Sequence, residues 1–149
     1  MTARAARVAA VLLAAAAVGT LTSGCAGTGV TAARLDGSVA PTFTRMYQWQ
    51  QRLQGHTTPA ARRLGARAHC VRGVSGDTGA GPDWTCTIQY FESGPSTPVS
   101  FSYDVSVKPD GCWTAENGPP SLGRRQLRTA AGATVPNPVY AIDGCFQAT

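Results

Sequence analysis

The sequence predicts an α+β domain, in which one or two N-terminal helices pack on an antiparallel sheet of three or four strands. Apolar residues recur at three- and four-residue steps between residues 41 and 68, which is typical of helices with one buried face. Between residues 84 and 107 the period changes to two, which is typical of strands. A small β-sandwich is the alternative, but it needs about seven strands, and the chain supplies at most five candidate segments.

The first helix is expected over residues 41–53, with Thr42 as the capping residue at its start. Its apolar face is formed by residues at helical spacing, namely Phe43, Met46, Tyr47, Gln50 and Leu53. A second, shorter helix is expected over residues 60–68, because Pro59 suits the first turn of a helix. We expect Leu64 to be the buried residue of this second helix.

Two segments alternate between apolar and polar residues without a break. The first covers residues 84–90 and the second covers residues 99–107. Such alternation places one face against a core and the other in water, as in an antiparallel sheet that is covered on one side. Residues 92–97 are rich in serine, glycine and proline and form the turn between the two strands.

A tight turn, Lys108-Pro109-Asp110-Gly111, follows the second strand, because proline presets φ and glycine tolerates a positive φ. Residues 112–116 are then the third strand of a meander. Residues 121–138 are expected to be a long surface loop or a weak edge strand, because they contain few large aliphatic residues. Residues 139–146 complete the sheet as a last strand.

Residues 1–24 have the three-part organisation of an export signal. Arg4 and Arg7 are followed by fourteen apolar or small residues, fewer than the ~20 that span a bilayer. The junction Leu21-Thr22-Ser23-Gly24-Cys25 resembles the lipobox of bacterial lipoproteins, and the resemblance implies that Cys25 is lipidated after cleavage. Ordinary cleavage nearby, with Cys25 left as a free thiol, is the alternative.

The residues after the signal are expected to divide into a tether and a single domain. Residues 25–40 are small, contain glycine and threonine, and lack apolar periodicity, so we expect a flexible tether. Residues 41–149 have the length of one small domain. The lipid at Cys25 then holds this domain at the extracytoplasmic face of the cell membrane.

Four cysteines remain after Cys25, and an even number permits full pairing in an oxidising compartment. They are Cys70, Cys86, Cys112 and Cys145. Four cysteines permit three connectivities. We favour Cys70 with Cys86 and Cys112 with Cys145, because neighbours in the sequence close most simply.

Basic and acidic residues are segregated along the chain. Residues 37–76 contain six arginines and no acid, whereas residues 77–116 contain six acids and one lysine. Three arginines and one aspartate follow in residues 117–149. The pattern predicts a basic helical layer beside a more acidic sheet. The sharper hypothesis is a basic face that contacts anionic lipid headgroups or anionic wall polymers.

Trp49 lies between Arg45 and Arg52 in the first helix, and a surface tryptophan beside arginines suits a contact with a partner or with headgroups. The candidate contact residues are Trp49, Arg45, Arg52, Arg62, Arg63 and Arg67. Trp84 and Trp113 stand near cysteines in strands, and we expect both to be buried.

The sequence contains no motif for catalysis or for a cofactor. His56 and His69 lack the spacing of metal ligands, and no Gly-x-Ser-x-Gly elbow occurs. We therefore predict no catalytic residues, no metal and no cofactor, and export argues against nucleic acid as a partner. Asp104 and Glu116 are the remaining candidates for the carboxylate pair of a hydrolase.

Several sequence features together resemble a known group. They are the Ala- and Arg-rich signal, Gly24-Cys25, Trp84-Thr85-Cys86, and Tyr103-Asp104-Val105-Ser106-Val107 leading to Asp110-Gly111-Cys112-Trp113. In these features the chain resembles the small lipoproteins of high-GC Gram-positive bacteria. The resemblance implies location and general shape and carries no activity. The spacing of the presumed disulfides is also similar to that of secreted subtilisin inhibitors, although Trp113-Thr114-Ala115 lacks the pattern of their reactive loop.

We therefore expect a non-enzymatic, lipid-anchored module that binds or modulates another component of the cell envelope, either an envelope protein or an anionic wall polymer. A serine protease inhibitor is the first alternative, and it requires an exposed loop flanked by a disulfide. A small envelope hydrolase is the second, and it requires a cleft near Asp104, Glu116 or a histidine, in which an acid and a base converge.

Overall fold

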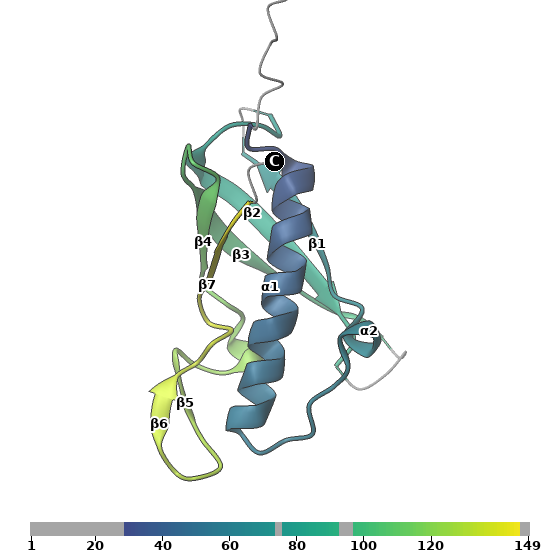
Figure 1. Cartoon of the computed structure of the whole chain (residues 1–149), viewed down its shortest axis with the longest axis vertical. Helices are drawn as coiled ribbons and strands as arrows, with labels where there is room; N and C mark the ends of the chain where they lie inside the picture. Colours follow the sequence, from purple (N-terminus) through teal and green to yellow (C-terminus); the bar gives the residue numbers. More distant parts are fainter. Residues whose placement is uncertain (1–28, 74–75, 93–96, 147–149) are drawn as a thin grey trace, which may run out of the picture.

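The computed structural model describes residues 29–73, 76–92 and 97–146 of the chain. In this part, the long helix α1 (Ala32–Leu53) lies across one face of a five-stranded antiparallel sheet with the order β1-β2-β3-β4-β7 (Figure 1). The strand bounds are β1 Arg67–Arg72, β2 Gly81–Tyr90, β3 Val99–Val107, β4 Cys112–Glu116 and β7 Ile142–Cys145. The predicted α+β class is confirmed, with five strands in place of three or four.

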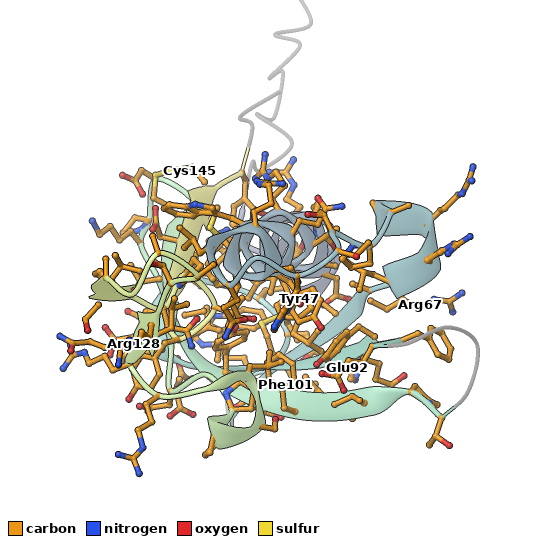
Figure 2. All side chains as sticks on the ribbon, turned by 90° about the horizontal axis from the view of Figure 1, so that it is seen from below. Tyr47, Arg67, Glu92, Phe101, Arg128 and Cys145 are labelled. Atoms are coloured by element: carbon orange, nitrogen blue, oxygen red, sulfur yellow. A yellow bond between two sulfur atoms is a disulfide. The ribbon has the colours of Figure 1, made fainter. Side chains whose placement is uncertain are left out.

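The sheet curves around α1, so that both of its edges contact the helix. The helix packs against β1 at one edge and β7 at the other, and it also contacts β2. Figure 2, which looks along the helix, shows the sheet passing beneath it. The buried stripe of the helix includes Leu35, Val39, Phe43, Tyr47 and Gln50. The inward residues of the strands, such as Trp84, Ile88 and Tyr103, complete the core.

α1 begins well before residue 41, where the sequence pattern indicated its start. Thr31 is the N-cap, and its side-chain oxygen accepts a hydrogen bond of 3.3 Å from the first turn. Leu35 and Val39 are fully buried and extend the apolar stripe by two turns. The expected flexible tether over residues 25–40 is therefore wrong from Thr31 onward. Small residues between the two buried positions conceal the helical period.

Pro41 lies inside α1 rather than at its start. Proline has no amide hydrogen, so the carbonyl of Gly37 cannot accept the usual bond from one turn later. Both residues are exposed, and water is available to that carbonyl. The helix therefore continues through the proline, as Figure 1 shows.

The second helix is shorter than predicted. α2 spans Ala61–Leu64, and Gly65, with a φ of 51°, ends it in the left-handed conformation. The expected helix over residues 60–68 is therefore wrong beyond Leu64, which is buried as predicted. The next residues form β1, whose arginines at both ends conceal its alternation.

The alternating segments form the strands that the sequence predicts. β2 and β3 pair in antiparallel fashion, with Trp84 opposite Val105, and the intervening side chains face outward. Residues 108–111 form the predicted tight turn, which is closed by a backbone hydrogen bond of 3.0 Å. β4 coincides with the predicted strand over residues 112–116. The last strand is shorter than the expected 139–146.

Residues 121–138 form neither a simple surface loop nor an edge strand of the main sheet. They include the end of a 3₁₀ turn and a separate two-stranded hairpin, with the bounds η1 Pro120–Leu122, β5 Gln126–Arg128 and β6 Thr134–Pro136. The hairpin is attached to the end of α1, where the Ala130 amide donates to the Leu53 carbonyl at 2.9 Å.

The two disulfides join Cys70 to Cys86 and Cys112 to Cys145, which is the predicted connectivity. In each pair the cysteines stand directly opposite one another, on β1 and β2 or on β4 and β7. Each disulfide therefore fastens an edge strand to its inner neighbour. The first lies on the helix side of the sheet, where both cysteines are buried. The second lies on the outer face, because the neighbouring Trp113 points inward and successive side chains alternate.

Glycine is required where β7 meets β4. A Cβ built at Gly144 would lie 2.8 Å from Cζ2 of Trp113, closer than side chains pack. The indole is held in place because its Nε1 donates to Ser38 Oγ of α1 at 2.9 Å. The bare backbone at Gly144 therefore lets the edge strand close over a ring that is itself bound to the helix.

A buried polar network connects α1 to the segment around the hairpin. The Gln50 side-chain amide donates to the Leu122 carbonyl and, at 2.9 Å, to the side-chain oxygen of Asn137. Asn137 in turn donates to the carbonyls of Leu122 and Arg124, both at 3.0 Å. Gln50 and Asn137 are 2% and 4% exposed, so these bonds replace the water that both side chains lose on folding.

We expect Gln50→Ala to lower the free energy of unfolding by about 2–3 kcal/mol, because it opens a cavity and removes the donor to two buried oxygens. The matched control is Gln48→Ala on the same helix, which removes a partly exposed side chain that donates to the Pro59 carbonyl. This control is expected to cost less than about 1 kcal/mol. Urea unfolding of both variants measures the difference, and equal losses would contradict the role of the network.

Candidate functional site: the outer side of α1

The predicted contact residues are all exposed, but they do not form one surface. Three lie on α1 and three lie on α2 or at the start of β1: Arg45, Trp49 and Arg52, then Arg62, Arg63 and Arg67. Figure 2 shows Arg67 and Arg128 on opposite sides of the molecule, with α1 between them. Arg67 thus lies to one side of α1, and the contact residues on α1 are considered as a site of their own.

Arg34 extends this group along the helix. At about 3.6 residues per turn, Arg34, Arg45 and Arg52 are separated by about three and two turns, so they project from one side of α1. The line from the first to the last is about 27 Å long at ~1.5 Å per residue. Trp49 lies beside this line, one turn after Arg45, and its side chain is 47% exposed. We call these four residues the basic face.

No acidic side chain neutralises the basic face within the described parts of the chain. The one salt bridge there joins Arg72 to Asp83, from β1 to β2. Asp36 is the only acid in α1, and its carboxylate accepts a hydrogen bond from the Cys70 amide at 2.7 Å. Arg45 and Arg52 are exposed and Arg34 is half-buried, so their positive charge remains available to a ligand or a surface.

Three of the acids lie on the opposite side of the domain. Asp104 on β3, Glu116 on β4 and Asp143 on β7 are exposed, and the residues next to them in each strand point inward. They therefore lie on the outer face of the sheet. Acids therefore lie on the outer face of β3, β4 and β7 and arginines on the outer side of α1, as predicted, although Arg67 is also exposed on β1.

Two hollows flank the basic face on the side of β7. The first, which we call the Trp49 hollow, has a volume of about 320 Å³, and its apolar lining includes Trp49, Leu53, Val135, Pro136, Pro138 and Tyr140. Arg125 also lines it. The second hollow, of about 480 Å³, lies nearer the start of α1 and is lined partly by Arg34, Arg45 and Phe146. No acid lines either hollow, so the positive character of the helix continues into both.

Trp49 differs from the other two tryptophans in exposure. Trp84 and Trp113 are each 1% exposed, as predicted. Their indole nitrogens donate to the Gly79 carbonyl at 3.0 Å and to Ser38 Oγ at 2.9 Å. Trp84 and Trp113 therefore belong to the core, and Trp49 is the tryptophan that faces solvent.

The histidines do not combine into a metal site. Nδ1 of His56 lies 3.0 Å from Oε1 of Gln51, and His69 is exposed on β1 opposite Thr87. Over residues 29–73, 76–92 and 97–146, no group of three or more histidine, cysteine or carboxylate side chains is arranged to hold a metal ion.

A polar hollow near the end of α1 contains Tyr47, His56 and Glu92. Burial, and to a lesser extent the negative charge of Glu92, raise the pKa of Tyr47 above its ordinary value. The phenol therefore stays protonated near neutral pH and is not a general base there.

The residues of the two alternative functions occupy unsuitable positions. Asp104 and Glu116 stand opposite each other on β3 and β4, but both are exposed on the outer face of the sheet, and Asn117 donates to Asp104 at 2.7 Å. Residues 113–115, which the likeness to subtilisin inhibitors singles out, lie within β4 and pair with β3 and β7 on both sides. This stretch is therefore not a protruding loop.

Sequence reasoning missed Arg34 and the residues that line the Trp49 hollow. Arg34 lies in the segment interpreted as a tether, and the spacing of Leu35, Val39 and Phe43 was the signal that would have revealed the helix. The hollow is formed largely by residues beyond 134, and the sequence carries no periodic signal there.

Cys25 and the proposed signal lie outside the described residues. In the part of the chain that the structure describes, no helix combines the length and the hydrophobicity needed to cross a bilayer. The chain matches no protein-family model, no curated protein and no solved structure.

We expect acrylamide to quench the emission of Trp49 selectively, because the other two indoles are buried. Trp49→Phe is expected to remove most of the quenchable emission and to change the free energy of unfolding by less than about 0.5 kcal/mol. Trp84→Phe serves as the control, since it removes a buried indole and leaves the quenchable emission of Trp49 intact. Strong quenching that survives Trp49→Phe would contradict the assignment.

Proposed function

We propose that the chain is a lipid-anchored protein on the extracytoplasmic face of the cell membrane. In this proposal it is a non-enzymatic module that binds an anionic component of the envelope through the basic face of α1. The lipid is carried by Cys25, at the end of an export signal. The bound component is recognised by exposed arginines and a tryptophan.

The pairing of cysteines supports the anchoring part of the proposal. Four of the five cysteines form two disulfides, which leaves Cys25 as the one cysteine outside them. Disulfides of this kind are typical of small domains in oxidising compartments. The positively charged and apolar stretch before Cys25 has the organisation of a signal that leads there.

The observation that carries the binding part is the composition of the basic face. Three arginines project from one side of the helix without an acid beside them, and an exposed tryptophan stands between two of them. Arginine and tryptophan are the residues that contribute most often to binding energy at contacts. The combination of three arginines with the exposed ring, rather than the ring alone, therefore favours a binding role.

Replacement of the lipidated residue tests the anchor. We expect Cys25→Ser to move the protein from the membrane fraction to the soluble fraction or to block its maturation, because no acyl chains are attached. Ser23→Ala, which keeps a small residue at the junction, is expected to leave the protein in the membrane. Mass spectrometry of the native N-terminal peptide measures the modification directly, and an unmodified Cys25 would refute the anchor.

Removal of charge tests the binding surface. We expect Arg34→Gln, Arg45→Gln and Arg52→Gln together to reduce retention of the native protein on an immobilised polyanion, and the effect should vanish at high salt. The matched control removes the same charge elsewhere, with Arg62→Gln, Arg63→Gln and Arg67→Gln. Equal loss in the two triple variants would show that net charge, rather than the basic face, governs binding.

A further inference from the structure

We infer that the anionic component is the headgroup surface of the bilayer that holds the anchor, and that α1 lies along this surface with its basic face toward the lipid. The inference rests on the proposed function, because it requires a lipid at Cys25. It adds the identity of the partner and the orientation of the domain. Four observations carry it, namely the length of chain before the fold, the line of arginines, the exposed indole and the position of the acids.

The chain between Cys25 and the folded domain is short. Val30 is 5% exposed within the core, and Thr31 pairs with Thr78 in a β-bridge, so the described fold already includes a residue five positions after Cys25. Five residues reach at most about 17 Å. An anchored domain therefore starts close to the headgroups, and a rotation about this short link brings the side of α1 to the surface.

The basic face suits a plane better than a compact ligand. Arg34, Arg45 and Arg52 are spread over about 27 Å along a single helix. A small anion can contact only one or two of them, whereas a flat anionic surface parallel to the helix contacts all three. Each arginine near such a surface increases affinity by about fivefold. The three arginines therefore act together only on an extended partner, and the short chain after Cys25 favours the bilayer surface over a polymer.

Trp49 supplies the apolar contact of the same face. Tryptophan is enriched at the boundary between headgroups and acyl chains, where its ring is apolar and its nitrogen can still reach water. Its side chain is 47% exposed, and the apolar Trp49 hollow lies directly beside it. The arginines on α1 thus suit the anionic headgroup layer, and the indole beside them suits the boundary with the acyl chains.

The acids determine which side of the domain faces the lipid. Asp104, Glu116 and Asp143 lie on the outer face of the sheet, on the other side of the domain from α1. An anionic bilayer repels that face and attracts the basic face. The two preferences act in the same direction, so one orientation is selected.

The experiment uses the native lipidated protein in vesicles whose phosphatidylcholine carries brominated acyl chains, which quench nearby indoles. One set of vesicles contains phosphatidylglycerol as well, and the other contains phosphatidylcholine alone. Because Trp84 and Trp113 are buried, quenching by the lipid reports on Trp49. We expect strong quenching of Trp49 in the anionic vesicles and several-fold weaker quenching in the neutral ones.

The triple variant Arg34→Gln, Arg45→Gln and Arg52→Gln is expected to lower quenching in anionic vesicles to the level of neutral vesicles. The control variant Arg62→Gln, Arg63→Gln and Arg67→Gln removes equal charge and is expected to retain the quenching. Trp49→Phe gives the baseline, and circular dichroism verifies that each variant is folded. Equal quenching of native protein in both kinds of vesicle would overturn the inference, because anionic headgroups would then have no effect.

A soluble polyanion, added to protein in neutral vesicles, distinguishes failure of this inference from failure of the proposed function. If the polyanion protects Trp49 from acrylamide while anionic vesicles do not quench it, the basic face binds an envelope polymer and the bilayer assignment is wrong. If neither changes Trp49, both the inference and the proposed binding surface are wrong. If Cys25 proves unmodified, the anchor fails and the inference fails with it.

Discussion

The apolar stripe of α1 is buried by a sheet that reaches it from both edges, and the other features of the domain follow from this contact. Leu35, Val39 and Phe43 are fully buried, and each large apolar side chain that leaves water contributes about 1.5–3 kcal/mol. A single helix can fill the concave side of five strands only if the sheet curves around it. The edges are therefore the places where the fold needs further attachment.

Both edges are fastened to the rest of the domain in more than one way. At β1, a disulfide joins Cys70 to β2, and Asp36 of α1 accepts a hydrogen bond from the same cysteine's amide. At β7, a disulfide joins Cys145 to β4, and Gly144 allows the strand to close over Trp113. Free backbone amides on edge strands invite pairing with other chains, so their attachment to the helix also protects the domain from aggregation.

The parts of the fold that depend on a local pattern of side chains were predictable from the sequence. The alternation over residues 99–107 predicted β3, and pairing each cysteine with its neighbour in the sequence gave the correct disulfides. The start of α1 was missed because Gly37 and Pro41, which usually interrupt helices, stand among the buried residues and are tolerated only because they face water.

The Trp49 hollow was missed because tertiary contacts alone, through Asn137 and Gln50, bring its walls together. Trp49 itself was predicted as exposed, since a local helical pattern determines that property.

The same arrangement of one helix on one sheet also separates the charges. The core lies between one helix, α1, and one sheet. The solvated residues of these two layers therefore face outward on opposite sides of the domain. A basic helix and acidic strands thus produce a field across the thickness of the domain rather than along its length. The described fold already includes Val30, five residues after Cys25, so under the proposed lipidation this field lies close to the bilayer. A longer tether, such as the one that the sequence pattern indicated, would hold the domain farther from the proposed lipid, so the early start of α1 is what would keep the basic face within reach of the bilayer.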